Sequence, residues 1–202
     1  MHAACRFLLH PLLAALLALG LAAAANAAEG RRVALVVGNG AYAETAALPN
    51  PPNDARAVAA ALRDLGFEIL EATDLDHPAM LATLAGFAER LEGAAVGLFF
   101  YAGHGLQVAG ENYLVPVDAR LNREAQVRLQ TVPLQTVLQT MEAEVPTRVV
   151  LLDACRDNPL ARSLARSMGA TRSTAIGQGL ARVQVGLGTL IGYATAPGSG
   201  RA

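Results

Sequence analysis

The sequence predicts an α/β fold in which helices cover both faces of a mostly parallel sheet. Short apolar runs alternate with longer amphipathic segments along most of the chain. The first of these runs is continuous and the third is strongly apolar, which is typical of parallel strands buried on both faces. The amphipathic segments between them are long enough to be the helical crossovers that parallel strands require.

The first strand and the first helix have clear end signals. Val33–Val37 is a continuous apolar run that stops at Gly-Asn-Gly, so we predict a buried strand there. The following segment "NDARAVAAALRDLG" predicts a helix with Asn53 as its N-cap, Asp54 in its first turn and Gly66 at its end.

The same alternation continues to the end of the chain. We predict strands at 67–73, 94–105, 147–155 and 188–195, and helices at 77–93 and 131–145. Residues 111–118 predict a short hairpin arm that Pro116 keeps away from the sheet centre. Residues 158–186 predict a polar connection with a short helix near 160–168.

The first 27 residues are predicted to be a secretory signal peptide. Arg6 precedes an apolar run, Leu12–Ala25, and Ala25-Asn26-Ala27 resembles a cleavage site. An uncleaved membrane anchor is the alternative, although the run is short for a full span. We therefore expect an exported protein, periplasmic or secreted, without a stable membrane span after cleavage.

Composition excludes some functions and draws attention to one residue. The formal net charge of −1 does not favour nucleic acid as a partner. After signal cleavage the only cysteine is Cys155, so the chain cannot form an internal disulfide. Cys155 is either a small core residue or a reactive thiol.

One histidine is predicted to lie beside this cysteine. His104 follows the third predicted strand, Cys155 ends the fourth, and the carboxyl ends of parallel strands form one rim where ligands bind. A thiolate is a strong nucleophile, and a neighbouring imidazole can accept the thiol proton. Gly103 and Gly105 are expected to leave room for a substrate backbone. His77, at a predicted helix start, is assigned no such role.

Several motifs give the chain a resemblance to the caspase-like cysteine peptidases, and among them to the metacaspases and their bacterial relatives. The matching segments are "VALVVGNGAY", "NDA" at 53–55, "YAGHG" at 101–105, "LVPVD" at 114–118, "LLDACRDNP" at 151–159 and "YATAPG" at 193–198. The resemblance implies a three-layer α/β/α sandwich over residues 31–202. The family usually continues into a last strand and helix, so we expect an incomplete C-terminal sheet edge.

The resemblance also implies the roles of individual residues. It assigns Cys155 as the nucleophile, His104 as the general base, and the backbone N–H groups of Gly105 and Cys155 as oxyanion donors. It places Asp54, Ala102 and Asp153 around the pocket for the substrate residue before the cleaved bond, P1. Two carboxylates there attract a basic side chain and repel an acidic one, so we expect peptide or protein substrates with Arg or Lys at P1.

The arginine-rich connection suggests self-processing. Residues 158–202 contain no Asp or Glu, and Arg162, Arg166, Arg172 and Arg182 lie between the fourth and fifth predicted strands. Caspase-like enzymes are commonly cut at this connection. We therefore predict a self-cleavage after one of these four arginines, with a merely solvated basic face as the alternative.

Two alternative functions can be compared with that of a peptidase. A nucleotide-binding enzyme is disfavoured because "VVGNGAY" lacks both the third glycine of a dinucleotide loop and a G-K-[ST] motif. A non-proteolytic signalling or scaffold protein on the same fold is the main alternative, since fold does not determine function. We predict no cofactor, and no metal site, because the segment after His104 offers only Glu111 and Asp118 as carboxylates.

Overall fold

The computed structural model describes residues 30–155, 159–168, 176–177 and 180–194. The predicted signal peptide, residues 1–27, lies outside these residues, as does Arg172. Within the described residues, no helix has the length and apolar character that a membrane crossing requires.

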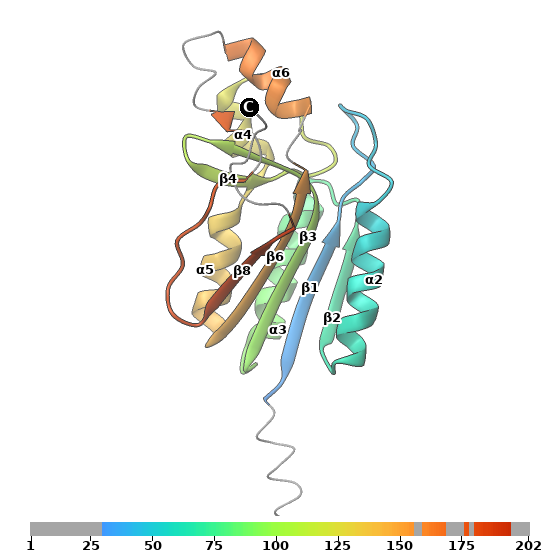
Figure 1. The fold of residues 1–202 in the computed structure, drawn as a ribbon, viewed down its shortest axis with the longest axis vertical. Coiled ribbons are helices and arrows are strands. Elements are labelled where there is room, and N and C mark those ends of the chain that lie inside the picture. Colours follow the sequence, from blue (N-terminus) through green and yellow to red (C-terminus); the bar gives the residue numbers. More distant parts are fainter. Residues whose placement is uncertain (1–29, 156–158, 169–175, 178–179, 195–202) are drawn as a thin grey trace, which may run out of the picture. The chain divides into compact units, whose positions relative to one another are not determined.

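The centre of the fold is a parallel sheet (Figure 1). Its strands are hydrogen-bonded in the order β2-β1-β3-β6-β8. Their bounds are Arg32–Gly38 for β1, Glu68–Thr73 for β2, Val96–Val108 for β3, Thr147–Cys155 for β6 and Thr189–Tyr193 for β8. All five were predicted from their apolar runs, and their parallel pairing confirms the predicted fold class.

Strand β3 extends to Val108, beyond its predicted end. It pairs parallel with one neighbour and antiparallel with another. Its first part, up to His104, runs parallel to β6. Its last residues, Gly105–Val108, pair antiparallel with β4 (Glu111–Leu114), which is the predicted hairpin arm. The short strands β5 (Val132–Pro133) and β7 (Ile176–Gly177) extend this antiparallel part.

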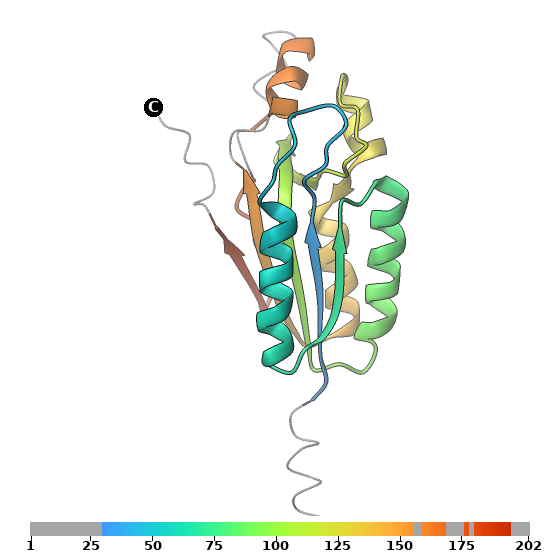
Figure 2. The same cartoon turned by 90° about the vertical axis from the view of Figure 1, so that its right-hand side faces the viewer.

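Helices cover the sheet on both faces, which gives the predicted three-layer arrangement (Figures 1 and 2). Helix α2 (Pro51–Asp64) packs on one face through Ala55, Ala59 and Leu62. On the other face lie α3 (His77–Leu91) and α5 (Leu134–Glu144). Two further helices, α4 (Glu124–Gln130) and α6 (Pro159–Met168), pack against the antiparallel part.

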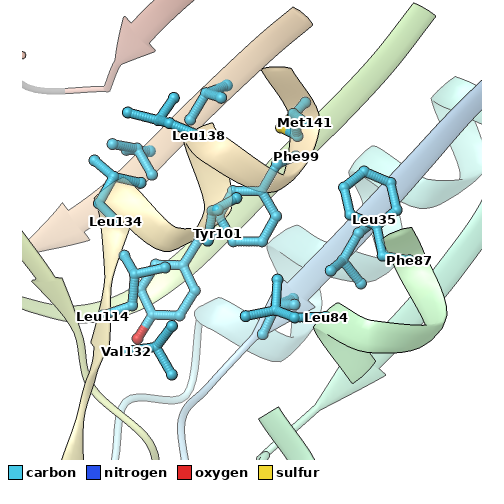
Figure 3. Packing of buried hydrophobic residues seen from close by; sticks show 14 of the residues in the cluster. Leu35, Leu84, Phe87, Phe99, Tyr101, Leu114, Val132, Leu134, Leu138 and Met141 are labelled. Atoms are coloured by element: carbon cyan, nitrogen blue, oxygen red, sulfur yellow. The ribbon is translucent and has the colours of Figure 1, made fainter. Parts of the chain in front are cut away.

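The largest apolar cluster lies between the sheet and helices α3 and α5 (Figure 3). Phe99 and Tyr101 of β3 are fully buried in it, against Phe87 of α3 and Met141 of α5. Alternate residues of β3, such as Phe100 and Ala102, belong to the cluster on the α2 face. The strand therefore contributes apolar side chains to both layers, as its continuous apolar run predicted.

Strand β8 is bound to the sheet by β6 and by one buried arginine. The guanidinium of Arg148 donates hydrogen bonds to the hydroxyl of Thr189 at 2.7 Å and to the carbonyls of Val145 and Leu187 at 2.8 and 2.6 Å. These contacts satisfy a charge that is only 7% exposed. They also hold the chain entering β8 against the end of α5 and the start of β6.

Three local predictions were wrong or incomplete. Helix α2 begins at Pro51 with Asn50 as its N-cap, and Asn53 lies inside its first turn, where its side-chain amide donates to the carbonyl of Pro49. Proline fixes the backbone angle that the first helical residue needs, so the helix starts earlier than Asn53 suggested. Helix α4 and the two-residue strands β5 and β7 were not predicted.

Candidate active site

The structure places His104 and Cys155 opposite each other in neighbouring strands. Their Cα positions are paired in the parallel register of β3 and β6, where adjacent strands lie about 4.8 Å apart. Cys155 is the last residue of β6, and its side chain lies outside the described part of the structure. The predicted neighbourhood of these two residues is therefore present in the backbone.

The side chain of His104 is buried in the protein. It is 2% exposed, and its ring packs on the ring of Tyr42 with centroids 4.4 Å apart. Among the described residues, neither ring nitrogen has a hydrogen-bond partner. Burial lowers the pKa of His104 from 6.5 to about 4, so the imidazole is neutral at neutral pH and one of its nitrogens can accept a proton.

The glycines beside His104 do not leave the room that the sequence suggested. A Cβ atom on Gly103 would lie 2.6 Å from the hydroxyl oxygen of Tyr42, and one on Gly105 would lie 2.8 Å from a methyl carbon of Leu180. Gly103 also has φ = +153°, which side chains rarely adopt. Both glycines allow protein atoms, rather than a substrate, to approach β3.

The three residues predicted to form a substrate pocket line one cavity. Asp54 of α2, Ala102 of β3 and Asp153 of β6 meet around a volume of about 160 Å³, together with residues Leu48, Pro49, Asn50 and Pro51. Ala102 and Asp153 are paired across β3 and β6, two residues before His104 and Cys155. The cavity is smaller than a typical small-molecule site of about 300–1,000 Å³, which suits a single side chain.

The cavity carries negative charge. Within the described part of the chain, no arginine pairs with Asp54 or Asp153. Partial burial, and then the charge of Asp54, raise the pKa of Asp153. A cation that enters beside Asp153 would favour the ionised form of this carboxyl group.

A second groove begins at Asp153 and continues along the ends of β6 and β8. Its volume is about 300 Å³, and most of its lining is apolar: Phe100, Leu151, Leu152, Asp153, Gly192, Tyr193 and Ala194. Because both hollows share Asp153, a chain segment could place one side chain in the charged cavity and its neighbours in this groove.

The candidate cleavage sites are in different settings. Arg162 and Arg166 are exposed on helix α6. Arg182 is exposed in the segment 180–187 and lines a third cavity of about 450 Å³ beside α5, on the sheet face opposite α2. Its neighbours are held, because the Asn112 side chain makes two hydrogen bonds with the backbone of Ala181 at 2.7 and 2.8 Å.

Within the described residues, no group of three or more His, Cys, Asp or Glu side chains gathers in a way that could hold an ion.

Comparison with known proteins connects this geometry to a family. The sequence profile of the family described as "Caspase domain" matches residues 31–200. This chain belongs to the caspase domain family. The membership supports a cysteine-peptidase type of function in general.

Individual proteins with a similar caspase domain share about a third or less of their residues with this chain. Mucosa-associated lymphoid tissue lymphoma translocation protein 1 of human and its mouse homolog are each 34% identical over 126 residues, which is 62% of this chain. The chain matches only 15% of the length of these curated relatives. The Drosophila initiator caspase Dronc is similar in structure, with a TM-score of 0.54, 14% identity, and coverage of 84% of this chain and 57% of Dronc. At that identity the similarity concerns the fold.

Three residues of this caspase-domain site were not predicted from the sequence. Asn39, Tyr42 and Tyr101 form a buried hydrogen-bonded group around the backbone of His104. Tyr42 and Tyr101 occur within "VALVVGNGAY" and "YAGHG", the segments that carried the family resemblance. Their contact with His104 depends on the packing of β1 against β3, which the sequence does not state.

Proposed function

We propose that this chain is a cysteine endopeptidase in which Cys155 is the nucleophile and His104 is the general base. The observation that supports it best is the register pairing of His104 with Cys155 beside a cavity that contains two carboxylates. The substrate residue before the cleaved bond, P1, is Arg or Lys, and its cation lies between Asp54 and Asp153.

In the proposed reaction the Cys155 sulfur attacks the scissile carbonyl carbon while the thiol proton moves to His104. The carbonyl oxygen becomes an oxyanion, stabilised by the backbone N–H groups that the family resemblance assigns to Gly105 and Cys155. The C–N bond then breaks, and the leaving amine takes the proton from His104. Water, deprotonated by the same imidazole, hydrolyses the thioester and restores the thiol.

The buried position of His104 affects the timing of the first proton transfer. Because burial lowers the pKa of His104 to about 4, an isolated imidazolium is unfavourable in this site. In the proposed mechanism the proton transfers to His104 as negative charge develops on the attacked carbonyl oxygen. In this respect His104 acts as a general base during the reaction.

Cleavage of fluorogenic peptides tests the proposal. The full chain is assayed with three matched peptides that have Arg, Lys or Asp at P1. Cys155→Ala should abolish cleavage, and His104→Ala should lower kcat by orders of magnitude, while His77→Ala is the matched control at the start of α3. Wild-type rates in Cys155→Ala would reject the mechanism and favour a non-proteolytic role.

The same assay tests the charged cavity. Asp153→Ala and Asp54→Ala should lower kcat/KM for the Arg peptide, at a cost of about 2–5 kcal/mol for a lost charge partner. Asp64, exposed at the other end of α2, provides the control substitution Asp64→Ala. Faster cleavage after Asp than after Arg by the wild type would contradict this assignment.

We further propose that the chain cuts itself after Arg162, Arg166, Arg172 or Arg182. An extended backbone suits a peptide that lies along a strand edge, and Arg162 and Arg166 lie in a helix. Arg182 lies outside any helix or strand, but Asn112 and the hydroxyl of Tyr193 hold its neighbours Ala181 and Val183. Cleavage there requires these contacts to open.

Intact mass under denaturing conditions tests self-processing. Wild type should give two fragments that meet after one of these arginines, and Cys155→Ala should remain whole. If Arg182 is the site, Asn112→Ala should accelerate the cut and Arg182→Ala should prevent it. An active wild type that stays uncut would reject processing while leaving the peptidase assignment intact.

A further inference from the structure

We propose that the hydroxyl groups of Tyr42 and Tyr101 position His104 by replacing the strand contacts that β3 loses beyond the end of β1. The inference rests on the proposed function, because it concerns the placement of the proposed general base. Tyr42 and Tyr101 are positioning residues here, since they act through His104.

The first observation is that β1 ends before β3 reaches His104. The last pair of these strands is Gly38 with Ala102, and the Asn39 N–H donates to the carbonyl of Ala102 at 2.9 Å. Alternate residues of a strand direct their backbone groups to the same neighbour, so His104, two residues later, faces the space beyond β1. Its N–H and carbonyl need other partners there, because they are buried.

The second observation is that tyrosine hydroxyls occupy both of these places. The N–H of His104 donates to the hydroxyl oxygen of Tyr42 at 2.7 Å. The hydroxyl of Tyr101 donates to the carbonyl of His104 at 2.8 Å, and the N–H of Val115 donates to the same carbonyl at 3.0 Å. The backbone of His104 is thereby fixed on the side that β1 leaves open.

The third observation is that the two hydroxyls are themselves held. They lie 3.4 Å apart, and both are within hydrogen-bond distance of the Val115 carbonyl, at 3.4 Å for Tyr42 and 3.0 Å for Tyr101. The buried side chain of Asn39 donates to this carbonyl as well, at 3.3 Å. Gly103 makes the arrangement possible, since a Cβ atom there would meet both hydroxyl oxygens within 3 Å.

The fourth observation connects this group with the imidazole. Among the described residues the ring nitrogens of His104 have no hydrogen-bond partner, so no polar contact there fixes the ring directly. The ring of Tyr42 packs against the imidazole of His104, with the two ring centroids 4.4 Å apart. The Tyr42 hydroxyl also accepts a hydrogen bond from the backbone N–H of His104. One residue thus holds the base at two points.

Kinetics of conservative variants test the inference. Tyr42→Phe and Tyr101→Phe keep the rings and remove only the hydroxyl groups. A small displacement of a catalytic group can cost about 100-fold, so we expect kcat for the Arg peptide to fall about 10- to 100-fold, with KM within about 3-fold of wild type. Alkylation of Cys155 at about pH 9.5, above the pKa of about 8.5 of a free cysteine, should remain at the wild-type rate.

The matched control is Tyr113→Phe. Tyr113 is 2% exposed, belongs to the same apolar cluster as Tyr42, and donates its hydroxyl to Glu111 at 2.6 Å. The variant loses one hydroxyl and its hydrogen bond to Glu111, yet it should keep the wild-type kcat. Thermal unfolding of all three variants shows how much stability each hydroxyl contributes.

The outcomes separate this inference from the proposed function. Wild-type kcat in the folded Tyr42→Phe and Tyr101→Phe proteins, or an equal loss in Tyr113→Phe, would overturn the positioning role while Cys155 stays essential. If Tyr42→Phe does not fold, the Tyr101→Phe result decides. If Cys155→Ala keeps wild-type activity, the proposed function fails, and the positioning role fails with it.

Discussion

Asp153 illustrates how burial and one charged neighbour change the chemistry of a single residue. Burial and the adjacent charge of Asp54 both raise the pKa of Asp153, so its carboxyl group holds a proton at a higher pH than an ordinary aspartate. Protonation removes the charge that is proposed to attract a basic P1 side chain. The site is therefore expected to lose its preference for Arg as the pH falls through this raised pKa.

This gives a prediction about the pH profile. For the Arg peptide, kcat/KM should decline in mildly acidic solution, and Asp54→Asn should move that decline to lower pH because one cause of the raised pKa is removed. The check is kcat/KM against pH for both proteins. A decline at the same pH in both would show that Asp54 does not act on Asp153.

His104 predicts a pH dependence of stability rather than of specificity. Its pKa is about 4 in the folded protein and about 6.5 in an unfolded chain, so the folded state binds the proton more weakly. The stability linked to this residue is complete above about pH 6.5 and is lost as the pH falls toward 4. The shift corresponds to about 3 kcal/mol.

Urea unfolding at about pH 7 and about pH 4.5 measures this effect. His104→Asn cannot titrate, so its free energy of unfolding should change less between the two pH values than that of wild type. An equal change in both proteins would show that His104 does not contribute to acid unfolding.

At the scale of elements, the sequence predicted what depends on patterns of many residues. The five parallel strands follow from apolar runs and helices α2, α3 and α5 from amphipathic ones, while α6 is the short helix expected within the polar connection. The failures concern short or context-dependent features. Helix α4 spans seven residues, and its start depends on the Gln126 side chain accepting from the backbone of Asn122 and Arg123.

In the candidate active site, too, some features were predictable from sequence patterns and others depended on local contacts. The glycine-flanked histidine and the cysteine at a strand end were predictable because strand order places both at one edge of the sheet. The tyrosine hydroxyls were not, because their partners are backbone groups that become available only where β1 stops and β3 continues. Sequence patterns report which side chains are buried, but not which backbone groups lack a strand partner.

Gly103 provides a prediction for the junction of β1, β3 and β4. Gly103→Ala should destabilise the protein by about 1–3 kcal/mol and reduce activity, because it combines a strained backbone with displaced tyrosine hydroxyls. The matched control is Gly86→Ala in α3, where a Cβ atom meets nothing within 4 Å. That change should stabilise the helix by about 0.5–1 kcal/mol. Urea unfolding compares the two, and similar destabilisation in both would contradict the explanation.

At the scale of the whole sheet, the two faces of β6 and β8 are covered unequally. Leu152 of β6 is 3% exposed and packs in the cluster with α3 and α5. On the α2 side, Val149 and Leu151 are half-buried and Leu190 of β8 is 63% exposed. In the described part of the chain, α2 covers β1, β2 and β3, while this side of β6 and β8 remains more open.

The unequal cover predicts unequal costs of truncation. Leu152→Ala should destabilise the protein by about 2–5 kcal/mol, because it leaves a cavity in a packed cluster. Leu190→Ala should change the free energy of unfolding by no more than about 0.5 kcal/mol, because this side chain is already largely in water. Urea unfolding measures both, and a large loss at Leu190 would show that the α2 side of β8 is covered in solution.

The place of β8 in the sheet determines what a break in the preceding connection would do. β8 follows Arg162, Arg166, Arg172 and Arg182 in the chain, yet from Thr189 to Tyr193 it is paired with β6, and Arg148 holds its beginning. Hydrolysis after any of these arginines would therefore leave two polypeptides in one folded particle, which would elute from a sizing column like the intact chain. Refolding after denaturation would then be bimolecular, so its rate would depend on protein concentration.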